Sequence, residues 1–134
     1  MFVEMLNELL DSARKAREQA YCPYSRFPVG AALLTSDNEI FAGCNVENLS
    51  FGLTVCAERT ALFSAMAAGK RQFSGMVLLT DTPEPVTPCG ACRQALYEFS
   101  PNLWIVTQTC MVSSAYTGSA SFCLMRFWRK FKQT

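Results

Sequence analysis

The chain has 134 residues, of which half are hydrophobic and 17% are charged, as is typical of one globular domain large enough to bury a core. Residues 1–125 carry eight basic and eleven acidic side chains, and the last nine residues carry the other four basic ones. A body of slight negative charge binds polyanions poorly, so we expect no nucleic acid partner.

No apolar run approaches the ~18 residues that a membrane helix needs, so we also expect no membrane partner. The N-terminal stretch MFVEMLNELLDSARK lacks a basic leader followed by a long uncharged segment, and so it does not resemble a signal peptide. We therefore expect a cytoplasmic protein.

In chain order, the apolar side chains of residues 3–20 recur at helical spacing, which predicts an amphipathic helix that ends before Pro23. Residues 27–34 (FPVGAALL) predict a buried strand, residues 35–39 a turn, and residues 40–48 a partner strand. Because side chains alternate along a strand, Asn45 and Glu47 are expected to face the same side.

The second half of the chain continues the alternation of helix and strand. A helix is predicted from about Cys56 to near Gly69, with Thr54 as its N-cap, and a continuous apolar strand at residues 75–80. A further helix is predicted from Cys89 to about Phe99, and a strand at residues 103–109. This order predicts a single α/β domain, a mixed β-sheet with helices on both faces.

The C-terminal end differs in composition from the rest of the chain. Residues 112–121 are small and polar, whereas residues 122–132 are aromatic and basic. We expect an irregular terminus or a short packing helix here. The alternative is a segment that touches a membrane or nucleic acid.

Three of the seven cysteines form the pattern that predicts a function. Cys89 and Cys92 are three residues apart, so their thiols lie on one face of a helix or reach one ion from a tight turn. Such a pair also serves redox chemistry. The addition of Cys56 favours a metal site, because three soft thiolates suit zinc.

The chain has no histidine, so a zinc site must be built from thiolates and carboxylates, and Ser-His-Asp and Cys-His catalysis are excluded. A structural zinc ion normally takes four protein ligands, whereas three ligands with an open fourth position are typical of a catalytic one. None of the other four cysteines stands at C-x-x-C spacing. We therefore expect a catalytic zinc ion.

Glu58 is the candidate proton carrier beside this metal. Cys56 and Glu58 lie about 200° apart on a helix, so Glu58 is not expected to be a ligand, although it can reach a zinc-bound water from the far side. The alternative is an acidic residue that only favours the positive end of a helix. The charges of three thiolates and Zn²⁺ sum to −1, and Arg59 can offset that negative charge. The alternative interpretation of Arg59 is an exposed helix residue with no role at the metal.

Four segments together resemble the small, three-cysteine cytidine deaminases of pyrimidine salvage: FPVGAAL (27–33), GCNVEN (43–48), GLTVCAERTAL (52–62) and PCGACRQ (88–94). C-A-E followed by P-C-x-x-C is the signature of zinc deaminases. The likeness runs from about residue 5 to residue 108. It implies a three-layer α/β/α fold, a nucleoside deaminase domain at residues 1–110 and an unmatched tail at residues 111–134.

The resemblance also implies the metal centre. Cys56, Cys89 and Cys92 would hold Zn²⁺, and Glu58 would be the catalytic general acid and base. Arg59 and Gln94 match positions that support the cysteine ligands in this family.

The pocket for a small pyrimidine nucleoside follows from the same resemblance. Phe27 would line it beside the pyrimidine, and the backbone of Ala57 would meet the base. Asn45 and Glu47 would bind the ribose.

The implied reaction is hydrolysis of cytidine or deoxycytidine to uridine or deoxyuridine and ammonia, with Glu58 moving protons from the zinc-bound water to N3 and to the leaving amine. Small members of this family are homotetramers, so we expect the same assembly. Two departures stand out: Phe51 replaces a tyrosine common in relatives, and the usual Leu-Leu-Pro ending is not found after about Gln108.

Two other functions compete with this interpretation. One is deamination of a different aminopyrimidine nucleoside, for example an antibiotic of the blasticidin type. The other is an inactive zinc-binding scaffold or assembly subunit.

Overall fold

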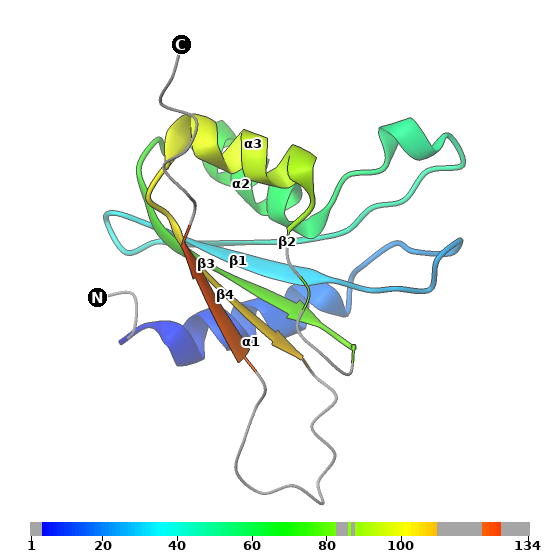
Figure 1. Ribbon diagram of the computed structural model, residues 1–134, viewed down its shortest axis with the longest axis horizontal. Helices are drawn as coiled ribbons and strands as arrows, with labels where there is room; N and C mark the ends of the chain where they lie inside the picture. The colour runs from blue at the N-terminus through cyan, green and yellow to red at the C-terminus, as the bar shows by residue number, and fades with distance from the viewer. Residues whose placement is uncertain (1–3, 83–85, 87, 110–121, 127–134) are drawn as a thin grey trace, which may run out of the picture.

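Five strands form one mixed sheet in the order β2-β1-β3-β4-β5 (Figure 1). The structure, a computed structural model, describes residues 4–82, 86, 88–109 and 122–126, the last five by their backbone alone.

The central strand β1 (Gly30–Thr35) pairs antiparallel with β2 (Ile40–Cys44) on one side and with β3 (Phe73–Thr80) on the other. β3 is parallel to β4 (Trp104–Thr109), and β4 is antiparallel to β5 (Phe122–Arg126). The predicted mixed sheet is confirmed.

Helices cover both faces of the sheet, as predicted (Figure 1). α1 (Leu6–Arg17) packs on one face, and α2 (Ala57–Ala67) and α3 (Gly90–Phe99) pack on the other. A short 3-10 helix, η1 (Phe51–Leu53), precedes α2. Every residue of β1 is buried, because its side chains alternate between the two helical layers.

Two glycines allow these helices to lie close to the sheet. A Cβ atom at Gly30 would lie 2.0 Å from the carbonyl oxygen of Ala13 in α1. One at Gly43 would lie 2.4 Å from the backbone nitrogen of Ala61 in α2. The absence of a side chain at both positions therefore sets the distance between the layers.

The first predicted strand begins later than expected, at Gly30. Pro28 has no N–H to donate to a neighbouring strand. The carbonyl oxygen of Phe27 and the N–H of Val29 are bound instead by the side-chain amide of Asn45, at 2.8 Å each. The Asn45 side chain thus adds two bonds to the single backbone bond made here, from the Asn45 N–H to the Val29 carbonyl oxygen at 3.3 Å.

The second predicted strand ends earlier than expected, at Cys44 rather than residue 48. Beyond it, Val46 makes only isolated bridges, to Tyr21 and to Val55. Asn45 and Glu47 therefore lie just past the strand.

The prediction of Thr54 as the N-cap of α2 was wrong. Cys56 is the N-cap, and Thr54 closes η1. The Thr54 hydroxyl accepts a hydrogen bond from the N–H of Asn48 at 3.2 Å, so it is engaged away from the helix.

The tail also differs from the expectation of an irregular end or short helix. Residues Phe122–Arg126 form β5, which pairs with β4 along its full length. Its pattern, FCLMR, has one aromatic residue and no β-branched one, so strand propensity gave no signal. Residues 110–121 and 127–134 of the predicted tail lie outside the described residues, and the division of the chain at residue 110 stays a prediction. Within the described ranges, no helix combines the length and hydropathy needed to cross a membrane.

Candidate active site

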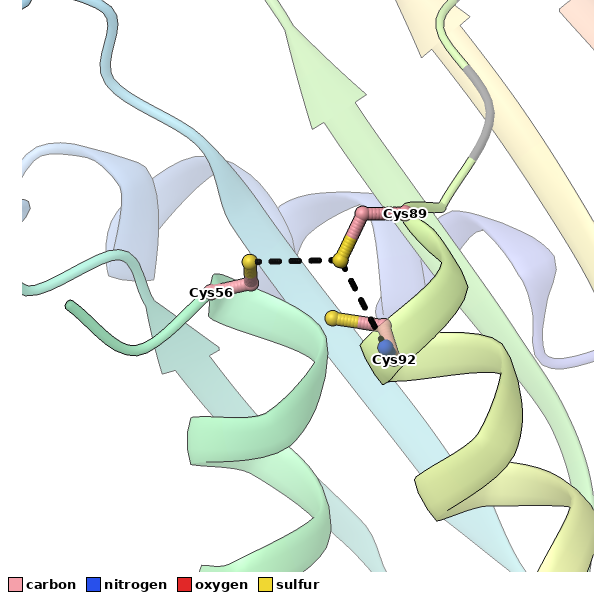
Figure 2. Close-up of side chains that lie close together, drawn as sticks. All are labelled: Cys56, Cys89 and Cys92. Carbon is pink, nitrogen blue, oxygen red and sulfur yellow. Dashed lines mark hydrogen bonds between the residues drawn. The ribbon is translucent and has the colours of Figure 1, made fainter. Parts of the chain in front are cut away.

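The first turns of α2 and α3 bring together the three cysteines that the sequence singles out (Figure 2). Cys56 is the N-cap of α2, Cys89 is the N-cap of α3, and Cys92 lies in the first turn of α3. The Sγ atoms of Cys56 and Cys89 are 3.7 Å apart, and all three Sγ atoms lie within 4.8 Å of one another. Residues 33 positions apart in the sequence therefore face one another.

This arrangement fits a zinc ion. With Zn–S bonds of 2.3 Å, two sulfurs of a tetrahedral site lie about 3.8 Å apart, close to the separation of Cys56 and Cys89. Zinc is also the metal that three thiolates favour. No histidine, aspartate, glutamate or fourth cysteine joins the group among the residues that the structure describes. The donor set leaves a fourth position for a non-protein ligand.

Two neighbouring thiols and one guanidinium group stabilise the Cys56 thiolate. Its pKa falls to about 5, because hydrogen bonds from Cys92, Arg59 and Cys89 favour the thiolate, in that order of size, against the effect of burial. The Arg59 guanidinium lies 3.6 Å from the sulfur. The pKa of Cys92 is raised, since its proton is held in the bond to Cys56 and burial opposes its charge.

Cys89 has a different partner. Its sulfur accepts a hydrogen bond from the backbone N–H of Cys92 at 3.5 Å, drawn as a dashed line in Figure 2. Free N–H groups at a helix start favour negative charge, so both helices help to hold thiolates here.

Glu58 lies on α2 beside the cysteines and is only 4% exposed. Burial raises the pKa of its carboxyl group, and the neighbouring Cys56 thiolate adds to this shift. A hydrogen bond with Cys92 acts in the opposite direction. A raised pKa makes the carboxyl group a better proton acceptor than an ordinary glutamate, which suits a general acid–base catalyst.

Arg59 bridges the cysteine cluster and a neighbouring cavity. The Nη2 atom that contacts Cys56 also lies 3.5 Å from the carbonyl oxygen of Thr54, which lines that cavity. The cavity has a volume of about 380 Å³ and is lined by Tyr24, Ser25, Glu47, Phe51 and Thr54. It is large enough for a small ligand.

Of the predicted pocket residues, only Glu47 lines this cavity. Its carboxylate accepts hydrogen bonds from the segment Tyr24–Ser25. Phe27 and Asn45 lie nearby, joined to each other through the Asn45 amide, and Asn45 is 8% exposed. Ala57 is fully buried at the first position of α2.

Gln94 follows Cys92 by two residues on α3, and its support of the cysteines stays a prediction. It lies on the exposed side of α3, and within the described chain no hydrogen bond joins it to the three thiols. Tyr24, Ser25 and Thr54 were not predicted to line the cavity. The signal that could have found Tyr24 and Ser25 was their position three and two residues before Phe27, the first residue of the motif FPVGAAL.

Comparison with known proteins agrees with this geometry. The family described as the cytidine and deoxycytidylate deaminase zinc-binding region matches residues 3–108. A cytidine deaminase of Sporosarcina psychrophila is 54% identical over 94 residues, which are 70% of this chain and 69% of that one. One of Halalkalibacterium halodurans is 55% identical over 93 residues, or 69% and 70% of the two chains.

The fold is shared with a solved structure as well. The crystal structure of cytidine deaminase from Burkholderia pseudomallei superposes with a TM-score of 0.80 at 46% identity, and the match covers 90% of this chain and 91% of that one. The matched region contains the three cysteines, Glu58 and the residues around the cavity. The chain therefore belongs to the cytidine and deoxycytidylate deaminase family of zinc-binding enzymes.

Proposed function

We propose that this protein hydrolyses cytidine and deoxycytidine at C4, giving uridine or deoxyuridine and ammonia. The observation that carries the proposal is the buried carboxyl group of Glu58 beside three clustered thiols that leave a fourth ligand position. The relatives named cytidine deaminase support the choice of substrate.

We assign the metal ligands to Cys56, Cys89 and Cys92. Bound zinc would supply the Lewis acidity that makes a water molecule acidic near neutral pH. Three thiolates would weaken that effect by leaving the site with a net charge of −1. Arg59 and the N-terminal ends of α2 and α3 offset the negative charge.

Glu58 carries the protons of the reaction. It takes one from water as the C4–O bond forms and delivers it to N3 of the pyrimidine. It then takes the remaining proton from the hydroxyl group at C4 and delivers it to the amine, so that the C4–N bond breaks, the C4 carbonyl forms and ammonia leaves. Burial keeps the carboxyl group away from bulk water, so it returns its proton to the substrate rather than to solvent.

The cavity beside Thr54 is the proposed nucleoside pocket. We assign ribose binding to Glu47 and Asn45, contact with the pyrimidine to Phe27, and contact with the base to the backbone of Ala57. The role of Gln94 in supporting the cysteines stays a prediction, because its side chain lies on the exposed side of α3.

We propose a homotetramer, with no nucleic acid or membrane partner, located in the cytoplasm. Self-association is supported by the exposed apolar side chains of Leu49, Phe51 and Leu53, each more than half accessible in the single chain. Exposed large apolar side chains that lie close together in the sequence are consistent with an interaction site. Light scattering of the purified protein measures the number of copies.

The test is to offer cytidine, deoxycytidine and cytosine separately and to measure ammonia and bound zinc. We expect ammonia from both nucleosides. Glu58→Ala should retain its zinc and lose at least 100-fold in turnover, the lower end for general acid–base catalysis. Glu98→Ala changes an exposed glutamate of α3 and is the control. Zinc without ammonia in the unmodified protein would indicate the scaffold, and normal turnover of Glu58→Ala would remove the role of Glu58.

A further inference from the structure

One short side chain, that of Ser25, connects two of the proposed pocket residues. Its hydroxyl donates a hydrogen bond to Oε2 of Glu47, and its backbone N–H donates to Oε1 at 3.1 Å. The same hydroxyl oxygen accepts a bond from the N–H of Phe27 at 3.1 Å. Ser25 itself lines the cavity.

The contacts of Glu47 leave it with capacity for a ligand. A carboxylate accepts about four hydrogen bonds, two on each oxygen. Oε1 accepts from the backbone N–H groups of Tyr24, at 3.0 Å, and Ser25, so it is filled. Among the residues that the structure describes, Oε2 accepts only from the Ser25 hydroxyl, which leaves one further position that can accept a hydrogen bond from a sugar hydroxyl group.

Charge on Glu47 is fixed by the same contacts. The pKa of its carboxyl group is lowered, first by the hydrogen bond from the Ser25 side chain and then by the two backbone N–H groups. An ionised carboxylate forms stronger hydrogen bonds with a hydroxyl donor than a neutral group does. Ser25 thus orients the Glu47 carboxylate and adds to the preference for its ionised form.

Arg26, the residue between Ser25 and Phe27, has an unfavourable backbone conformation. Arg26 has a φ of 55°, in the left-handed region that non-glycine residues seldom occupy. Its N–H donates to the carbonyl oxygen of Cys22 at 2.9 Å, and the Ser25 hydroxyl receives the following N–H. These bonds hold Phe27 at its place beside the segment that carries Asn45.

We propose that Ser25 is a positioning residue for nucleoside binding: through one hydroxyl group it orients the Glu47 carboxylate toward the sugar and fixes the backbone at Phe27. The proposal rests on the proposed function, because it assigns a sugar to the free position on Glu47. It predicts that Ser25 determines how tightly the nucleoside binds and leaves the chemical step to Glu58 and the metal ligands.

The first test compares Ser25→Ala with the unmodified enzyme. We expect the KM for cytidine to rise about tenfold, which corresponds to the smaller of the effects seen when a protein loses one hydrogen bond to a charged group. The kcat should stay within about twofold of the value for the unmodified enzyme. Ser64→Ala, an exposed serine of α2, is the matched control and should leave both constants unchanged. A fall in kcat without a rise in KM, or no change in KM, would overturn the proposal.

A second pair of variants separates the hydroxyl group from the shape of the side chain. Ser25→Thr and Ser25→Val have nearly the same shape, and only threonine keeps the hydroxyl. Ser25 is exposed, so the extra methyl group has room. Threonine should restore KM to within about threefold of the unmodified enzyme, and valine should match alanine. This pair decides the question even if Ser25→Ala folds poorly, and equal KM values for the pair would contradict the proposal.

A double-mutant cycle tests whether Ser25 acts through Glu47. Glu47→Gln alone should raise KM, and adding Ser25→Ala to it should raise KM by less than about threefold, because no carboxylate remains to be oriented. A full tenfold further rise would show that the two residues act independently. Failure of the proposed function is a different result: the unmodified enzyme would then release no ammonia from cytidine.

Discussion

Gly43 allows α2, the helix that carries Glu58, to lie against the sheet, and we predict that Gly43→Ala displaces that helix. A Cβ atom at residue 43 would lie 2.4 Å from the nitrogen of Ala61 and 2.7 Å from the carbonyl oxygen of Ala57. Ordinary contacts begin near 3.4 Å, and both atoms belong to the backbone of α2, so no side chain can rotate away. The helix must move by up to about 1 Å.

The displacement has a cost in stability and a larger one in activity. Overpacking of this kind costs about 1–3 kcal/mol, which lowers the Tm of a domain of this size by roughly 3–15 °C. Cys56 and Glu58 stand at the start of α2 and move with it, whereas Cys89 and Cys92 stand on α3. A misplacement of about 1 Å can cost 100-fold in rate, so we expect kcat/KM and zinc per chain to fall in protein that is still folded.

Gly30→Ala is the matched control, because it creates a similar clash with the other helical layer. Its Cβ atom would lie 2.0 Å from the carbonyl oxygen of Ala13 in α1, on the face away from the cysteines. It should lower Tm at least as much, yet retain zinc and kcat/KM below its unfolding temperature. Gly90→Ala meets open space and should not lower Tm. The reasoning is refuted if Gly43→Ala keeps its zinc and activity, or if Gly30→Ala loses them equally.

Three further predictions concern the site. Arg59→Ala should raise the pKa of the Cys56 thiol from about 5. The pH at which Cys56 is alkylated in the zinc-free protein, as measured by mass spectrometry, should then increase. An unchanged pH profile of alkylation would exclude the contribution of Arg59. Asn45→Ala leaves two backbone groups without partners and should cost about 1–3 kcal/mol in urea unfolding, and unchanged stability would contradict this. Burial raises the pKa of the Glu58 carboxyl group, so the folded chain binds the carboxyl proton more tightly than the unfolded chain does. This difference stabilises the folded chain at low pH, and the contribution is lost as pH rises from about 4.5 through the raised pKa. Glu58→Gln has no ionisable group at residue 58. In the zinc-free state, its Tm should therefore rise relative to that of the unmodified protein as pH increases through this window. A difference in Tm that does not change with pH would argue against a buried, titrating carboxyl group.

The elements with strong periodicity could be predicted from the sequence. The long amphipathic pattern predicted α1, and the continuous apolar run at residues 75–80 predicted most of β3. The C-x-x-C pair with a more distant cysteine predicted the cluster, because metal-binding chemistry restricts residue type and spacing together. Each of these signals can be read from residue type and spacing, without knowledge of the rest of the fold.

What the sequence could not predict depends on contacts between distant segments. Ser25 meets Glu47 across 22 residues, and the Asn45 amide binds backbone groups of Phe27 and Val29. Neither contact leaves a periodic pattern. β5 lacks strand propensity and forms because β4 offers an open edge for pairing.

The parallel pairing of β3 with β4 explains how cysteines from two helices meet. α2 leads into β3 and α3 leads into β4, so parallel strands require the two helices to run in the same direction on one face (Figure 1). Their N-terminal ends then lie at the same edge of the sheet, where Cys56 faces Cys89 and Cys92 (Figure 2). Had β4 been antiparallel to β3, the first turn of α3 would lie about 15 Å away, the length of a ten-residue helix. The same topology directs two positive helix ends at the thiols, so one feature of the sheet both brings the three thiols together and favours their thiolate form.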